Sequence, residues 1–137
     1  MRMTRITALV LSLALSAGAA GASAGAGLEN ERDINAGLLA LAVADKIRRE
    51  CNSIGGKFFK AQSYANGLKS LAAARGYSEA QIDAYINDDV EKEKMRQRRN
   101  AYFEARGASN LDAESLCVLG RAEMSQRSQI GQLLRAK

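Results

Sequence analysis

Two cysteines, Cys51 and Cys117, constrain the fold of this chain more than any other feature of its sequence. They are the only cysteines among the 137 residues, so just one intramolecular disulfide is possible. In the chain-entropy model, closing a loop of this length stabilises the folded state by roughly 4 kcal/mol. The alternative is two free thiols that are buried separately, and the compartment in which the protein folds decides between the two.

The N-terminal stretch indicates that compartment. The first five residues carry two arginines, an uncharged apolar run follows to residue 15, and small residues continue to residue 27. This three-part pattern is typical of a secretory signal peptide, and the apolar run is shorter than the roughly 20 residues of a membrane span. We expect cleavage after Ala24, with Ala26 as the alternative. The sequence therefore predicts a signal peptide over residues 1–24, a periplasmic location and a Cys51–Cys117 disulfide.

The composition favours an all-α fold. The chain has no proline, helix-forming residues are plentiful, and no alternating strand pattern extends beyond a few residues. The net charge is +5, and it falls to +3 when Arg2 and Arg5 leave with the signal peptide. A charge this mild does not support nucleic-acid binding. We predict a single helical domain over residues 34–137, preceded by a flexible lead-in over residues 25–33.

Apolar periodicity predicts four main helices and a short C-terminal one. In the second helix an apolar stripe begins at Phe58, and the small residues around Gly67 indicate either the close approach of a neighbouring helix or a bend. Gly107 suits a helix end and Asp112 suits an N-cap. The first three predicted helices span residues 34–50, 57–75 and 79–106. The fourth lies within residues 108–124 and begins at the Asp112 N-cap, and a last short helix of one or two turns lies within residues 128–137.

The stretch GYSEAQI (76–82) carries the clearest local signal in the chain. Ser78 and Gln81 have the spacing of a capping box, in which each side chain bonds the other residue's backbone N–H. Tyr77 and Ile82 have the spacing of the accompanying hydrophobic staple. Gly76 suits the end of the preceding helix. A helix is therefore expected to begin immediately after Ser78.

The residue types of common catalytic and metal sites are scarce. The absence of histidine excludes Ser-His-Asp and Cys-His centres as usually built and leaves too few ligands for zinc. The GGK stretch at 55–57 lacks the flanking residues of a phosphate-binding loop. The acidic residues from Asp88 to Glu93 could act as calcium ligands or paired carboxylates, but their helical spacing favours ion pairs with neighbouring basic residues. We predict no catalytic residue, no metal and no cofactor.

Two groups of polar residues are candidates for contact with a partner. Arg96, Arg98 and Arg99 lie in a basic run that favours a solvated face first, an acidic protein partner second and a membrane surface third. Few aromatic residues accompany them, which argues against nucleic acid. Gln129 and Gln132 lie in the C-terminal segment, whose apolar residues either complete the core or present a docking helix, and we favour the core.

Several segments, taken in order, resemble a known family. INAGLLALAVADKIRREC, NGLKS, GYSEAQIDAYI, EKEKMR, LCVLGRAEM and SQIGQLL are together similar to an uncharacterised domain-of-unknown-function family of small exported alphaproteobacterial proteins. The resemblance covers residues 34–135, and Cys51 and Cys117 match that family's two cysteines. It implies an envelope-located helical protein. It brings no catalytic residues, because none are established for the family.

The function expected from these features is non-enzymatic. We expect a protein-binding or structural module whose partner is another envelope protein, with an oligomeric state that the sequence does not indicate. One alternative is a periplasmic stress chaperone, which needs a conditionally exposed apolar face. Another is a cell-wall hydrolase that uses only carboxylates, which needs two acidic side chains about 5–10 Å apart in a cleft.

Overall fold

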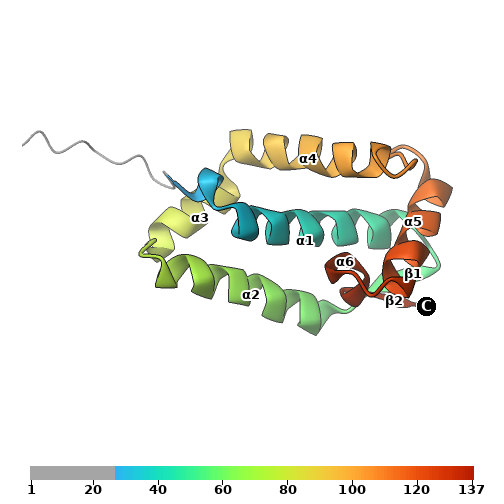
Figure 1. Ribbon diagram of the computed structural model, residues 1–137, viewed down its shortest axis with the longest axis horizontal. Helices are drawn as coiled ribbons and strands as arrows, with labels where there is room; N and C mark the ends of the chain where they lie inside the picture. The colour runs from blue at the N-terminus through green and yellow to red at the C-terminus, as the bar shows by residue number, and fades with distance from the viewer. Residues whose placement is uncertain (1–26) are drawn as a thin grey trace, which may run out of the picture.

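The computed structural model describes residues 27–137, and the predicted signal peptide lies outside them. These residues form an all-α fold with two very short strands (Figure 1), so the predicted fold class is confirmed. None of the described helices is long and apolar enough to cross a membrane. The elements are α1 (Arg32–Glu50), β1 (Ile54–Gly56), α2 (Phe58–Ala74), α3 (Glu79–Asn87), α4 (Asp89–Glu104), α5 (Ala113–Ser125), α6 (Gln129–Gln132) and β2 (Leu134–Ala136).

Helix α1 is the central element. α2 runs along one side of it, α4 runs along the other, and α5 packs at its C-terminal end (Figure 1). Val43 and Ile47 are completely buried between these neighbours. The nearly uninterrupted apolar run from Ala36 to Ala44 favours this position, because a helix with apolar residues on several sides gains most when neighbours cover them all.

Buried apolar side chains form two clusters, one toward each end of α1. The larger cluster surrounds Phe103 and Leu116, which are fully buried, and it includes both cysteines. The smaller cluster lies near the N-terminal end of α1 and contains a buried polar group, Asn35. The Asn35 side chain donates a hydrogen bond to the Leu28 carbonyl (2.7 Å) and accepts one from the Tyr85 hydroxyl (2.6 Å). Burial of Asn35 is therefore compensated by hydrogen bonds.

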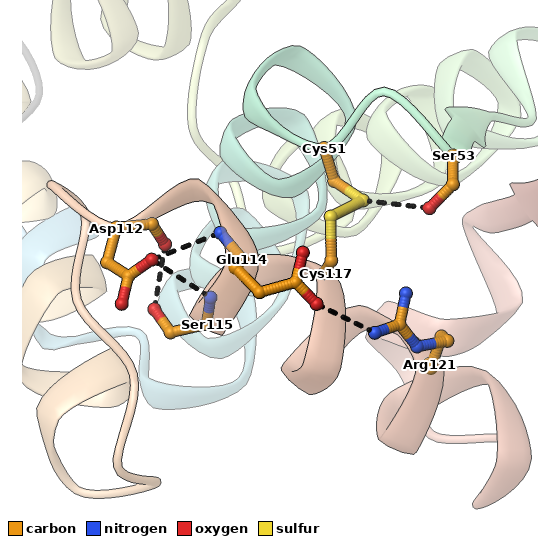
Figure 2. The surroundings of a disulfide bond; sticks show 7 residues. All are labelled: Cys51, Ser53, Asp112, Glu114, Ser115, Cys117 and Arg121. Carbon is orange, nitrogen blue, oxygen red and sulfur yellow. Dashed lines mark hydrogen bonds and ion pairs between the residues drawn. A yellow bond between two sulfur atoms is a disulfide. The ribbon is translucent and has the colours of Figure 1, made fainter.

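The predicted disulfide between Cys51 and Cys117 is present (Figure 2). Cys51 follows the last residue of α1 and Cys117 lies in α5, and their Cα atoms are 5.2 Å apart. The Ser53 hydroxyl lies 3.3 Å from the Cys51 sulfur. Beside the bond, α5 approaches α1 and β1 closely at Gly120, where a Cβ atom would lie 2.8 Å from the Ile47 side chain of α1 and 2.6 Å from the Ile54 side chain of β1.

The C-terminal segment differs from its predicted form. A short helix of one or two turns was expected within residues 128–137, and α6 is such a helix, but β2 follows it and was not expected. β2 pairs antiparallel with β1, with Ile54 opposite Ala136 and Gly56 opposite Leu134. Strands of three residues are too short to show an alternating pattern, which is why the sequence did not reveal them. The apolar side chains of this segment are buried, so the expectation that they complete the core is confirmed.

The single helix predicted over residues 79–106 is wrong, because the chain breaks at Asp88. This residue has an extended backbone (φ −67°, ψ 127°), ends α3 and begins α4. Its side chain accepts a hydrogen bond from the Glu91 backbone N–H (2.9 Å). An aspartate is compatible with two structures: it can lie on the charged surface of a continuous helix, or it can cap the free N–H groups at the start of a new one. At Asp88 the chain adopts the second structure.

The remaining local signals are confirmed. Ser78 and Gln81 form both hydrogen bonds of the capping box. Asp112 caps α5 by accepting from the backbone N–H groups of Glu114 and Ser115. Gly76 and Gly107 have φ angles of 94° and 71°, which glycine adopts more readily than residues with a Cβ atom.

Residues 27–33, within the predicted flexible lead-in, carry ordered contacts. Leu28 is buried in the smaller cluster and α1 begins two residues before the predicted start. Arg75, at the end of α2, forms ion pairs with Glu31 and with Asp33 (2.5 Å to Asp33). The Arg75 hydrogen bond lowers the pKa of Asp33 to about 2. These contacts fasten the start of α1 to the end of α2.

Close helix contacts occur at glycines other than Gly67. A Cβ atom at Gly67 would meet nothing within 4 Å, so the predicted close approach of a neighbouring helix is not found there. Instead, α1 approaches α2 at Gly37, where a Cβ atom would lie 2.6 Å from the Leu68 side chain. α6 approaches α5 at Gly131, where a Cβ atom would collide with the Glu123 backbone carbonyl.

Loss of the disulfide is expected to destabilise the domain. Replacing both cysteines by alanine (C51A/C117A) should lower the free energy of unfolding by about 2–4 kcal/mol, because the unfolded chain regains the entropy that the closed loop removes. Urea unfolding of the two proteins measures the difference, and reduced wild-type protein is the matched control. If wild-type protein that is denatured without a reducing agent shows two thiols that react with an alkylating reagent, the disulfide itself is contradicted.

Two glycine-to-alanine substitutions are expected to have opposite effects. Gly67→Ala should stabilise the protein by up to about 1 kcal/mol, because alanine is the better helix former and the site is open. Gly131→Ala should destabilise it by about 1–3 kcal/mol, because the added methyl group forces α6 away from α5. Urea midpoints measure both, and equal midpoints for the two variants would show that α6 does not pack as described.

Candidate functional site

A groove of about 710 Å³ lies between the C-terminal half of α1 and the N-terminal half of α2. Helix α2 has buried residues only further along, at Leu68 and Ala72, so its first turns leave part of the α1 surface uncovered. The apolar lining of the groove comes from both helices and from the residue before β2: Leu41, Ala44, Phe58, Ala61 and Leu133. The Lys57 backbone N–H, which donates to the Leu133 carbonyl (2.8 Å), holds these parts together.

Two consecutive phenylalanines stand exposed at the start of α2. Phe58 and Phe59 are 71% and 83% exposed, and their rings meet edge to face with centroids 5.6 Å apart. Phe58 begins the apolar stripe expected in this helix, but burial is reached only further along, at Leu68 and Ala72. Neighbouring helix residues diverge by about 100°, and the first turn of α2 is not covered by another described element. A large exposed aromatic pair is unusual on the surface of a small domain.

The rim of the groove carries charged side chains. Arg48 lies beside Gly56 and pairs with Asp45 (2.6 Å), which also pairs with Arg49 (3.0 Å). Lys57 lines the groove as well. The first turn of α2 contains no acidic residue, so the positive potential of this helix end is not offset there.

A second, shallower cleft of about 530 Å³ adjoins the groove and shares Lys57 with it. Its other basic lining residues are Arg127 and Arg135. The Arg135 guanidinium lies against Gly55, its partner in the β1–β2 pair. The two glycines of the GGK stretch therefore leave room beside β1 for two arginine side chains, those of Arg48 and Arg135.

The basic run of α4 does not form one surface. Arg96 is exposed and pairs with Glu93 (2.5 Å), whereas Arg99 is half-buried and donates to the Asn100 side chain. Burial lowers the pKa of Arg99, and the nearby charges of Arg49 and Arg96 lower it further. Arg98 is exposed and adjoins Arg99 in the chain, so it points about 100° away from Arg99 around the axis of α4.

The two glutamines predicted as partner contacts are exposed on α6. α6 and α4 lie on opposite sides of α1 (Figure 1), so the arginines and the glutamines do not form one site. Gln132 lines the shallow cleft and its side chain donates to the Arg127 carbonyl (3.1 Å). Gln129 is exposed beside it in the chain.

Glu123 is the buried carboxylate of the described structure, with 4% of its surface exposed. It accepts hydrogen bonds from the hydroxyls of Tyr102 and Ser128, and Arg106 lies 3.9 Å away. Arg106 also stacks 3.4 Å from the centroid of the Tyr102 ring. Burial, and then the Glu123 hydrogen bond, raise the pKa of Tyr102 to about 12. These contacts join α4, α5 and the start of α6 and leave Glu123 facing protein groups.

The acidic run at the start of α4 is used for caps and ion pairs. Asp88 caps the helix, Glu91 pairs with Lys94 (2.7 Å) and Glu93 pairs with Arg96. The predicted role of these residues in local ion pairs is thus seen for Glu91 and Glu93. Within residues 27–137, no group of three or more acidic or cysteine side chains is placed to hold a metal ion.

Sequence reasoning missed the residues that form the groove. Phe58 was expected to begin an apolar stripe, and neither Arg48 nor Arg135 was singled out. One signal was available, because two adjacent aromatic residues in a helix do not both fit one narrow buried stripe. The position of Arg135 beside Gly55 depends on pairing across the whole chain and has no local signal.

A comparison with protein-family models found one match, to a family of unknown function (DUF5333), over residues 26–135. Comparisons with curated proteins and with solved structures found no match. The match covers the disulfide, both apolar clusters and the groove, and it brings no assigned activity.

The Glu123 network has a measurable consequence at alkaline pH. Because the folded-state pKa of Tyr102 is raised above 10, its stabilising contribution is present below pH 10 and is lost as the pH rises toward 12. Glu123→Gln should lower the Tyr102 pKa toward 10 but not fully, since burial remains. Tyrosinate absorbance measures this, with Tyr102→Phe identifying the relevant transition. An unchanged titration in Glu123→Gln would show that the two side chains do not interact.

Proposed function

This chain belongs to the family of unknown function (DUF5333), and we propose that it is an exported envelope protein that binds another protein through the α1–α2 groove. The observation that carries the proposal is the exposed Phe58–Phe59 pair at an apolar groove. Exposed aromatic residues beside an apolar depression are typical of protein-binding surfaces, where they supply much of the binding free energy.

Export to the periplasm is supported by two features. The predicted signal peptide, with cleavage after Ala24, has the expected charge and apolar pattern, although it lies outside the described residues. The Cys51–Cys117 disulfide persists in an oxidising compartment and would be reduced in most cytosols. An alphaproteobacterial source, which the resemblance implies, belongs to the same proposal.

The groove is a better candidate than the basic run of α4. Two of the arginines there are engaged with Glu93 and Asn100, and partly exposed ion pairs contribute little to binding. At the groove, by contrast, apolar area of Phe58 and Phe59 is accessible and would leave water on binding, which is favourable. Among the described residues, no side chain buries the rings of Phe58 and Phe59.

Photocrosslinking in the living source cell tests this function. Phe59 is replaced by the photoreactive residue p-benzoylphenylalanine, and Leu111, which is 90% exposed before α5, is replaced in the same way as a control. We expect a discrete protein adduct at position 59 and none at position 111, because Phe59 lies against Phe58, which lines the groove, and Leu111 does not line it. Mass spectrometry identifies the adduct and the N-terminus of the mature chain.

Several results would contradict the proposal. Equal crosslinking at the two positions, or none at position 59, would remove the groove as a binding surface. A mature chain that still begins at Met1 would remove export. Adducts at position 59 with many unrelated unfolded proteins would favour the stress chaperone instead of a specific binding module.

A further inference from the structure

Because the linings of the α1–α2 groove and the adjoining cleft share Lys57, we treat them as two ends of one depression, and these ends differ in chemistry. The groove end is lined by apolar side chains and flanked by Phe58. The cleft end is basic, with Arg127 and Arg135 around it, and Lys57 lies where the two meet. A ligand that fills both ends must therefore present an apolar part and a negatively charged part.

The basic residues at the cleft end are not neutralised within residues 27–137. Lys57, Arg127 and Arg135 form no ion pair among these residues, and Asp45, the acidic residue of the lining, is already paired with Arg48 and Arg49. Like charges gathered without counter-charges repel one another, and an anionic partner relieves this repulsion. Charge complementarity therefore selects an acidic occupant.

Arg127, which lines the cleft, has an unusual backbone conformation. It has a φ of 51° and is the one residue other than glycine with positive φ in the described chain. It follows the C-cap of α5, a position at which glycine is favoured because a Cβ atom costs free energy there. An arginine here has a conformational cost that glycine would avoid, and this cost is the reason to test the Arg127 side chain.

We propose that this depression binds an acidic amphipathic segment of the partner protein. The inference rests on the proposed protein-binding function and names the chemistry of the partner. Apolar side chains of the segment, spaced as on one face of a helix, fill the groove beside Phe58 and Phe59. Carboxylates at one end of the segment pair with Lys57, Arg127 and Arg135.

The test uses purified mature protein and two designed helical peptides of about 18 residues, or five turns. Both carry leucine at helical spacing; one has glutamates and the other has lysines at the remaining charged positions. We expect the glutamate peptide to bind at least about tenfold more tightly at low salt, and this preference to shrink in roughly 0.5 M salt because the charges are then screened. Fluorescence anisotropy measures both affinities.

Arg127→Gly is the decisive variant. It relieves the strained backbone, so the urea midpoint should be unchanged or higher, while the glutamate peptide should bind about threefold to fivefold more weakly after the loss of one partly exposed charge. The control is Arg98→Gln, which removes one positive charge far from the cleft and should leave binding unchanged. Glutamine is used there because glycine would destabilise the interior of α4. Lys57→Gln should weaken binding like Arg127→Gly.

The peptide experiments test the acidic chemistry of the partner, and the crosslinking experiment tests protein binding at the groove. Equal binding of the two peptides, or an unchanged affinity in Arg127→Gly and Lys57→Gln, would overturn the acidic-segment inference, while an adduct at position 59 would leave protein binding in place. Tighter binding to phosphatidylglycerol vesicles than to the glutamate peptide, lost in the same variants, would overturn it in favour of a lipid surface. Loss of the adduct at position 59 would remove both proposals.

Discussion

The contact between α5 and the C-terminal end of α1 is the constraint on which the rest of the structure depends. The Cys51–Cys117 bond fixes it covalently, and Gly120 of α5 allows the close approach of Ile47 in α1. This contact brings β1, which follows α1, within reach of β2 at the C-terminus. Residues of α1 and of the C-terminal segment are thereby joined in the larger apolar cluster.

The groove follows from how α2 is held. Its C-terminal part is buried against α1 at Leu68 and fastened through Arg75 to the start of that helix. Its N-terminus is held by a backbone hydrogen bond from Lys57 to Leu133. Between these two attachments no bulky side chain of α2 fills the space above Ala44, so apolar surface stays accessible. A small domain with few large apolar residues concentrates them where helices meet, and Phe58 and Phe59 stay outside those contacts.

Polar groups set the details that apolar packing leaves open. Glu123 accepts hydrogen bonds from Tyr102 and Ser128 and so relates α4, α5 and α6 to one another. Burying a carboxylate costs free energy unless its oxygens accept hydrogen bonds. Arrangements of the three helices that break these hydrogen bonds are therefore disfavoured. The short α6 and the turn that carries Arg127 lie directly beside this network. The position of the basic cleft thus depends on a buried side chain that does not line it.

The sequence by itself determined the features that depend on neighbours within a few residues, on composition or on the number of cysteines. The capping box at Ser78, the cap at Asp112, the all-α class and the single possible disulfide are of this kind, because caps involve adjacent turns and two cysteines have one pairing. The tertiary structure alone decided the break at Asp88, the β1–β2 pair and the exposure of Phe58. Each has a locally acceptable alternative, and contacts between distant segments select among alternatives that local physics leaves nearly equal in free energy.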